Sequence, residues 1–130
     1  CPGQPDGYLP CRAVASASMA AGGMAADATS VARWGYQLYG GSVLSDASLR
    51  EMTDFRGDWY GLGAVDYSLG SPLEEGYGIP AVGHGGLGPA ASVALVAFPE
   101  TGLVVAVQTT IESLGPVHTI VRALKAAVEA

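Results

Sequence analysis

His84 is the one polar side chain in the glycine-rich segment 82–88, which precedes the most apolar part of the sequence. Gly85 and Gly86 follow it directly, and apolar runs come next at residues 92–98 and 103–107. If this segment is a strand, its glycines let a ligand lie against the backbone, and a backbone N–H can donate to an oxyanion that develops during acyl transfer. Taken alone, a histidine among glycines is more typical of a turn or of a surface position.

A sheet has to hold this segment, and the sequence predicts one. The run Pro99-Glu100-Thr101-Gly102 joins the two apolar runs as a β-hairpin, with Gly102 suited to the left-handed turn conformation. The runs are apolar on both sides, and such strands are usually covered on both faces. We therefore expect an α+β fold, an antiparallel sheet covered by helices, with strands at about 59–66, 82–87, 91–98 and 103–110.

Two helices are expected before the sheet. Asp27 can cap a helix over 27–39, in which Val31, Trp34 and Leu38 form the apolar face and Gly40-Gly41 ends it. Ser45 is the expected N-cap of a shorter helix over 46–53. The spacing favours core packing for Trp34, and the same is expected of Trp59.

A third helix is expected at the end of the chain, over 116–128, because Pro116 suits the first helical position. His118 is expected to face solvent. One apolar stripe should lie on the sheet, made of Val117, Ile120, Val121, Leu124 and Val128.

Composition limits the possible partners. The 130 residues suffice for one domain, and with 49% apolar and 14% charged residues the chain is not of the disordered type. A net charge of −6 with six scattered basic residues argues against nucleic acid, which needs clustered lysine and arginine. No run of about 18 apolar residues predicts a membrane span.

Cys1 and Cys11 are the only cysteines, in a segment rich in proline and glycine. We expect a disulfide that closes an irregular segment over 1–23, which would place the chain in an oxidising compartment; two free thiols are the alternative. Residues 24–130 then form the folded part. The cysteine spacing matches no zinc motif, and the two histidines lie far apart without a carboxylate cluster, so no metal site and no cofactor are predicted.

Several short segments resemble, in their order and spacing, the serine beta-lactamase and penicillin-binding protein family, which includes class C beta-lactamases, D-alanyl-D-alanine carboxypeptidases and esterases. The resemblance extends over about residues 20–129. The segments are Ala21-Gly22-Gly23-Met24, Ala32-Arg33-Trp34, Tyr60-Gly61-Leu62-Gly63, Gly83-His84-Gly85-Gly86 and Pro99-Glu100-Thr101-Gly102-Leu103.

The resemblance implies the C-terminal portion of a beta-lactamase/transpeptidase-like fold and a site on the histidine strand. The backbone N–H of Leu87 would be one oxyanion donor. His84 would polarise the site and help to hold a substrate carboxylate or the proton-transfer network, and Gly85, Gly86 and Gly88 would contact substrate. Gly85 stands where many family members have threonine or serine, which removes a hydroxyl and shifts the expectation toward an esterase.

Two motifs of that family are absent from these 130 residues. Lys125 is the only lysine, position 122 is arginine, and asparagine does not occur, so neither Ser-x-x-Lys nor Tyr-x-Asn is present. We expect an N-terminal remainder of the same protein to supply both, with this chain inactive alone. The intact protein would be an extracytoplasmic serine hydrolase acting through an acyl-enzyme on a small amide, ester or peptide; the alternative is a non-catalytic module that binds a peptide or cell-wall fragment.

Overall fold

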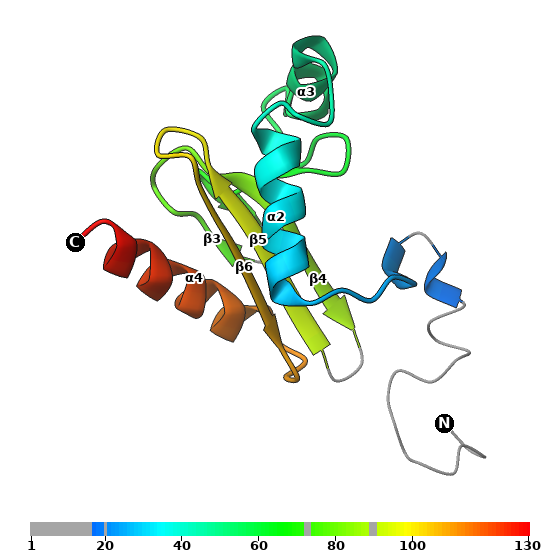
Figure 1. The fold of residues 1–130 in the computed structure, drawn as a ribbon, viewed down its shortest axis with the longest axis vertical. Coiled ribbons are helices and arrows are strands. Elements are labelled where there is room, and N and C mark those ends of the chain that lie inside the picture. The colour runs from blue at the N-terminus through cyan, green and yellow to red at the C-terminus, as the bar shows by residue number, and fades with distance from the viewer. Residues whose placement is uncertain (1–16, 20, 72–73, 89–90) are drawn as a thin grey trace.

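The computed structural model describes residues 17–19, 21–71, 74–88 and 91–130. Its centre is a four-stranded antiparallel sheet in the order β1-β4-β5-β6, with α2 and α4 packed against β5 and β6 (Figure 1). The elements are α2 (Ala28–Tyr39), α3 (Asp46–Met52), β1 (Val65–Asp66), β2 (Gly70–Ser71), β3 (Glu74–Glu75), β4 (Val82–Gly88), β5 (Ala91–Phe98), β6 (Leu103–Thr109) and α4 (Leu114–Val128). The predicted α+β class, an antiparallel sheet with helices, is confirmed.

The hairpin between β5 and β6 pairs as many residues as β4 and β5 do. Its register runs from Ser92 opposite Thr109 to Phe98 opposite Leu103. Gly102 closes the turn with φ +69°, and its N–H donates to the Phe98 carbonyl at 2.9 Å. This positive φ is strained for residues with a Cβ, which explains the glycine at this position.

Helices α2 and α3 begin at the caps that the sequence indicates. The Asp27 carboxylate accepts from the Ser30 N–H at 2.7 Å, and this hydrogen bond, with a second from the Ser30 hydroxyl, lowers the pKa of Asp27. Ser45 Oγ accepts from the Ser48 N–H at 3.2 Å at the start of α3. Gly41, at φ +78°, turns the chain away after α2.

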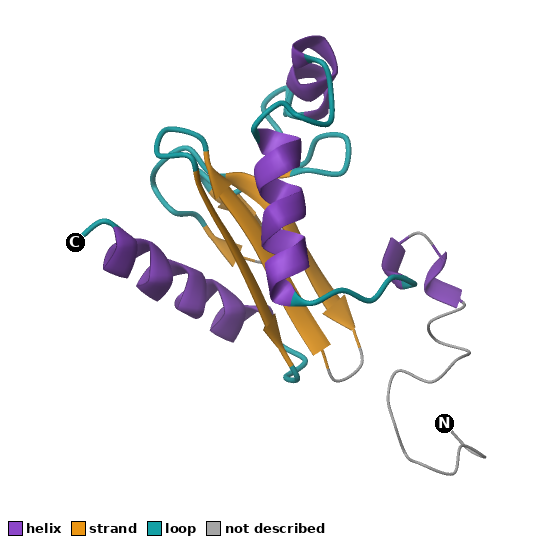
Figure 2. Ribbon diagram, in the orientation of Figure 1, coloured by secondary structure: helices purple, strands orange, loops and turns teal. Residues whose placement is uncertain are grey.

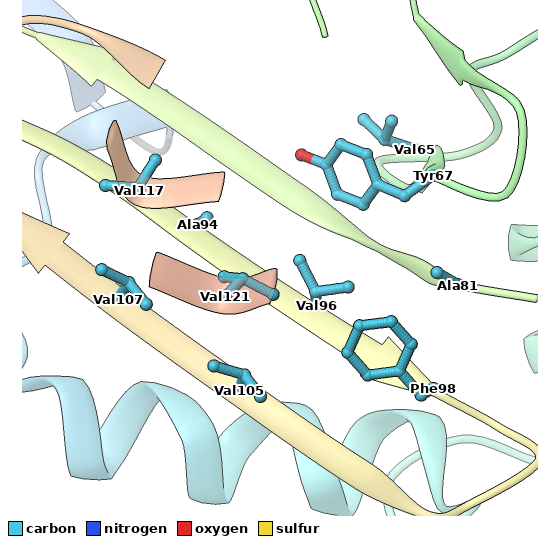
Figure 3. Close-up of a cluster of buried hydrophobic side chains, with 10 residues drawn as sticks. All are labelled: Val65, Tyr67, Ala81, Ala94, Val96, Phe98, Val105, Val107, Val117 and Val121. Atoms are coloured by element: carbon cyan, nitrogen blue, oxygen red, sulfur yellow. The ribbon is translucent and has the colours of Figure 1, made fainter. Parts of the chain in front are cut away.

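The main core lies between α4 and one face of the sheet (Figure 3). Val117 and Val121 of α4 have no exposed surface, and the ring of Phe98 is 1% exposed. Alternate residues of a strand point to the same face, so every second residue of β5 and β6 contributes. The buried set is Val65, Tyr67, Ala81, Ala94, Val96, Phe98, Val105, Val107, Val117 and Val121.

Helix α2 packs on the opposite face of the sheet, where it crosses the strands in Figure 2. Gly35 is the only fully buried residue of this helix. A Cβ at that position would lie 2.5 Å from Leu95 Cδ1 of β5 and 3.1 Å from Val104 Cγ1 of β6. The missing side chain therefore sets how closely α2 approaches the sheet.

The prediction for Trp34 is wrong, because this side chain is 50% exposed. The spacing of apolar residues in α2 indicates only roughly which side of the helix faces the sheet. The closest approach to the sheet is made at Gly35, and a glycine does not contribute to a hydrophobic pattern. Trp59, in contrast, is half-buried against the core between α4 and the sheet, as expected.

The strand expected over 59–66 is mostly absent. Only Val65–Asp66 forms β1, and Tyr60 makes a single bridge to Val65. Gly61 and Gly63 interrupt the extended chain, and Gly63 has φ +73°. These residues form a tight antiparallel turn because two glycines stand within four residues.

The solvent-facing prediction for His118 is also wrong. Helix α4 begins at Leu114, and its buried positions are Val117, His118 and Val121, with His118 3% exposed. The rings of Tyr67 and Tyr77 lie against the imidazole, with centroids 5.1 and 6.0 Å away. Aromatic neighbours and a hydrogen bond with Tyr77 make burial of this histidine favourable.

The buried face of α4 is consequently rotated from the predicted stripe. Ile120 is 40%, Leu124 44% and Val128 68% exposed. Of the five residues in the predicted stripe, only Val117 and Val121 are buried. The side of α4 that carries His118 faces Tyr67 and Tyr77, which precede β4.

Candidate active site

Strand β4 carries the histidine and the glycines that the sequence singles out. It pairs with β5 along its whole length. On its other side, β1 pairs only with Val82 and Gly83. No other strand in the described part of the chain pairs with residues 84–88 on that side. We call this open stretch the free edge of β4.

The direction of the backbone groups on β4 follows from a hydrogen bond beside it. The Tyr67 N–H donates to the Ala81 carbonyl at 2.9 Å, so the polar groups of residue 81 point toward β1. In an antiparallel ladder, residues two apart along a strand direct their N–H and C=O groups to the same side. Gly85 and Leu87 therefore direct theirs to the free edge.

His84 is exposed, and both of its ring nitrogens have partners. The Tyr60 hydroxyl lies 2.8 Å from Nε2, and the Gly85 carbonyl oxygen lies 2.6 Å from Nδ1. The rings of Tyr60 and His84 meet edge to face, with centroids 5.7 Å apart and planes at 77°. The Gly85 carbonyl that the imidazole reaches belongs to the free edge, so the ring sits beside the backbone groups that could act in acyl transfer.

A tight turn holds Tyr60 in this position. Tyr60 bridges Val65, and the Gly61 N–H donates to the Ala64 carbonyl at 2.8 Å. A Cβ on Gly61 would lie 2.4 Å from the Met52 carbonyl oxygen, so this close approach requires glycine. Because β1 pairs with β4, the turn sets the phenol beside His84.

Sequence reasoning places Tyr60 in a strand and does not predict its contact with His84. The two glycines at positions 61 and 63 are the sequence feature from which the contact could have been predicted. They indicate a turn, and such a turn places the preceding tyrosine beside β1. The register that brings Tyr60 to His84 depends on the pairing of β1 with β4, which local sequence does not specify.

The glycines of β4 differ in what requires them. A Cβ on Gly83 would lie 1.9 Å from the Leu95 carbonyl oxygen, and one on Gly86 would lie 2.8 Å from Val93 Cγ1. Gly88 has open space around it, with nothing within 4 Å of such an atom. Packing against β5 therefore explains Gly83 and Gly86, whereas Gly88 leaves room at the end of the strand.

Two cavities lie elsewhere in the described structure. One, of about 270 Å³, is lined by Tyr36 and Tyr39 and by the β5–β6 turn. Burial raises the pKa of the Tyr39 hydroxyl to about 12. The other, of about 390 Å³, lies between α2, β6 and α4. Neither is lined by residues 84–88. His84 and Leu87 are exposed, so the candidate site is an exposed strand edge.

The fold is an antiparallel α+β sheet whose histidine strand presents backbone donors at an open edge. The beta-lactamase family model matches residues 1–130, and the chain therefore belongs to the beta-lactamase family. Its sheet and helices are consistent with the scaffold of that family. No curated protein and no solved structure matches the chain.

The remaining predictions fall outside this edge. Cys1 and Cys11 lie outside the described residues, so their pairing stays a prediction. In the described part of the chain, no three His, Cys, Asp or Glu side chains gather to hold a metal ion. None of the described helices is long and apolar enough to cross a membrane.

Proposed function

We propose that this chain is the C-terminal part of an extracytoplasmic serine hydrolase that forms an acyl-enzyme with an amide or an ester. The observation that carries the proposal is the free edge of β4, to which Leu87 directs its backbone N–H beside the exposed His84. Membership of the beta-lactamase family supports a hydrolase scaffold. A backbone N–H that points to the open edge of a strand is the kind of donor that stabilises a developing oxyanion.

The reaction would proceed in two steps. A serine hydroxyl adds to the substrate carbonyl carbon, its proton passes to a base, and the carbonyl oxygen becomes an oxyanion that accepts from the Leu87 N–H. The carbonyl re-forms as the bond to the alcohol or amine breaks, and the leaving group takes a proton. Water then attacks the acyl-enzyme in the same way and releases the acid.

The nucleophile would come from an N-terminal remainder of the same protein that carries Ser-x-x-Lys and Tyr-x-Asn. Ser92 of β5, opposite Leu87 in the sheet, is poorly suited to replace it. It is 3% exposed, and its hydroxyl lies 2.7 Å from the Ile111 carbonyl and 2.9 Å from the Ser113 carbonyl. A buried hydroxyl held by carbonyls is not available to a substrate.

A binding module is the second candidate. The observation that favours it is the absence of Ser-x-x-Lys and of asparagine from all 130 residues. The same free edge would then hold a peptide or a cell-wall fragment without reaction, as strand edges do when they bind extended peptides.

The test uses a fluorophosphonate probe and a chromogenic ester on the chain alone and on the chain joined to its upstream segment. We expect no labelling and no hydrolysis with the chain alone, and both with the joined protein. Labelling of a serine in the isolated chain would contradict the first expectation. A joined protein that binds peptide but is neither labelled nor active would favour the binding module.

Two variants at one position separate the backbone of Leu87 from its side chain. Leu87→Pro removes the N–H at an open strand edge, where proline is tolerated, and should lower kcat in the joined protein by about 10²- to 10³-fold. Leu87→Ala keeps the N–H and should retain most of the activity. Equal losses in the two variants would rule out the backbone donor.

The extracytoplasmic location is part of the proposal, and so is the disulfide between Cys1 and Cys11. A thiol titration of the folded, unreduced protein should find no reactive sulfhydryl. Two reactive thiols would contradict both.

A further inference from the structure

The partners of His84 determine where its ring proton lies. A carbonyl oxygen can only accept, so Nδ1, at 2.6 Å from the Gly85 oxygen, must carry the hydrogen. A neutral imidazole has one N–H, and Nε2 is then an acceptor. The Tyr60 hydroxyl, at 2.8 Å, must donate to it.

Neutral His84 therefore has no donor left for a ligand. Its single N–H is bonded to the Gly85 carbonyl, and the Tyr60 proton is bonded to the ring. A substrate carboxylate beside His84 would have to break one of these hydrogen bonds. It would lose part of its hydration without gaining a charged partner, which is unfavourable.

The rest of β4 offers an anion no side-chain donor. Apart from His84, its residues are glycine, valine and leucine, so neither a hydroxyl nor a cation projects from the strand. The two basic side chains of α4 already have partners. Arg122 donates to the Glu75 carbonyl, and Lys125 pairs with Glu129. The chain as a whole carries a net charge of −6, which also opposes an anionic ligand.

We infer that the Gly85 carbonyl and the Tyr60 hydroxyl together hold His84 in the Nδ1–H tautomer, with Tyr60 as the positioning residue that donates to Nε2. The free edge of β4 consequently takes an uncharged ester or amide rather than a substrate with a carboxylate beside the reacting carbonyl. The substrate class rests on the proposed function, whereas the tautomer rests on the contacts alone. Tyr60 acts through His84 and needs no contact with the reacting atoms.

The first experiment reads the tautomer in the 130-residue chain. Spectra of ¹⁵N-labelled histidine are recorded at about pH 8, above the ordinary histidine pKa of about 6.5. His84, assigned by its absence in His84→Gln, should show a protonated Nδ1 and an unprotonated Nε2. Tyr60→Phe keeps the edge-to-face contact with Trp59 and removes only the hydroxyl, and it should shift His84 toward the Nε2–H form.

Two controls accompany this measurement. Tyr36→Phe removes the hydroxyl of an exposed tyrosine on α2 and should leave His84 unchanged. The buried His118 should keep its pattern in all of these variants, which would show that the core is intact. A predominant Nε2–H form in the unmodified chain, or no change of His84 in Tyr60→Phe, would overturn the positioning role.

The second experiment measures, without any catalytic reaction, whether the free edge of β4 binds an uncharged ligand more tightly than a charged one. The chain is titrated with butyramide and with succinamate, which carries a carboxylate in place of the terminal methyl group, and the amide signals of Gly85 and Leu87 are followed. We expect butyramide to bind at least about tenfold more tightly. Tyr60→Phe should reduce this ratio, because the fraction of His84 that shifts to the Nε2–H form can donate to the carboxylate.

Equal or tighter binding of succinamate, or no response of these amides to either compound, would overturn the substrate class. These two measurements can fail independently of the test of the proposed function. A joined protein without esterase activity would defeat the hydrolase, while the tautomer and the binding ratio would still decide this inference.

Discussion

At the scale of single residues, β4 acts through its backbone more than through its side chains. Packing against β5 requires Gly83 and Gly86, and the N–H of Leu87, which points to the free edge, owes its direction to the strand register. His84 is the one polar side chain, and the position of its ring hydrogen depends on the Gly85 carbonyl and on Tyr60. Substitutions in the turn that carries Tyr60 should therefore affect the site without touching β4.

Tyr39 provides a prediction about pH. Burial raises its pKa from 10.0 to about 12, so between these values the folded protein keeps a proton that the unfolded chain has lost. Its contribution to stability is complete below pH 10 and is lost as the pH rises to about 12. The loss should be up to about 2 kcal/mol. Urea unfolding across this range measures it.

Tyr39→Phe is the control for this prediction. It keeps the ring and removes the titrating hydroxyl, so its stability should fall less steeply between pH 10 and pH 12 than that of the unmodified chain. Parallel stability curves for the two proteins would show that Tyr39 does not titrate differently in the folded and unfolded states.

Sequence alone predicts part of the candidate site. His84 and its glycines are recognisable because polar residues are rare in such a strand, and the structure places them on β4 as an exposed edge. The partner of His84 is not recognisable, because Tyr60 lies 24 residues earlier and reaches it through the pairing of β1 with β4. Contacts of this kind depend on register, which a local pattern does not contain.

At the scale of elements, the approach of α2 to the sheet should depend on Gly35. Gly35→Leu places a side chain where even a Cβ would lie 2.5 Å from Leu95, so the helix must move away or the core must rearrange. Leucine is the better helix former by about 0.8 kcal/mol. The packing cost of about 1 to 3 kcal/mol should still leave a net destabilisation of about 1 kcal/mol, and of up to about 2 kcal/mol where the core cannot adjust, measured by urea unfolding.

Gln37→Leu is the matched control, because Gln37 is exposed on the same helix. It adds the same side chain without a clash and should change the free energy of unfolding by less than about 0.5 kcal/mol. Similar losses in the two variants would mean that Gly35 does not set the distance between α2 and the sheet.

The helices and strands also show which short-range sequence features are sufficient to predict structure. Caps and turns are short-range, so the beginnings of α2 and α3 and the β5–β6 hairpin lie where the sequence indicates. The buried face of α4 is decided by what packs on it. The tyrosines at 67 and 77 accommodate His118, which rotates the helix away from the stripe that apolar spacing predicts. Periodicity cannot include a buried histidine, because its burial depends on those partners.

At the scale of the whole molecule, α4 is bonded to a segment about 47 residues earlier in the chain. Arg122 Nη2 donates to the Glu75 carbonyl at 2.8 Å and to the Gly76 carbonyl at 3.1 Å. Its guanidinium lies 4.6 Å from the centre of the Tyr77 ring, and the Tyr77 hydroxyl lies 2.6 Å from His118 Nδ1. These contacts hold the segment that leads into β4 against the last helix.

Arg122→Met tests whether this connection stabilises the entire fold. Methionine keeps an apolar stem but removes two charge-assisted hydrogen bonds and the cation–π contact, which should cost about 2 kcal/mol in the free energy of unfolding. The amides of Tyr77 and Gly78 donate to the Tyr67 and Ser68 carbonyls. In Arg122→Met these two amides should exchange with solvent faster than in the unmodified chain, and their exchange should increase more than that of the β5 amides. Arg33→Met, at an exposed position of α2, should leave both the stability and the exchange rates nearly unchanged. If Arg122→Met leaves the stability and the exchange rates equally unchanged, the contacts of Arg122 contribute little, and β4 must be held by its pairings with β1 and β5.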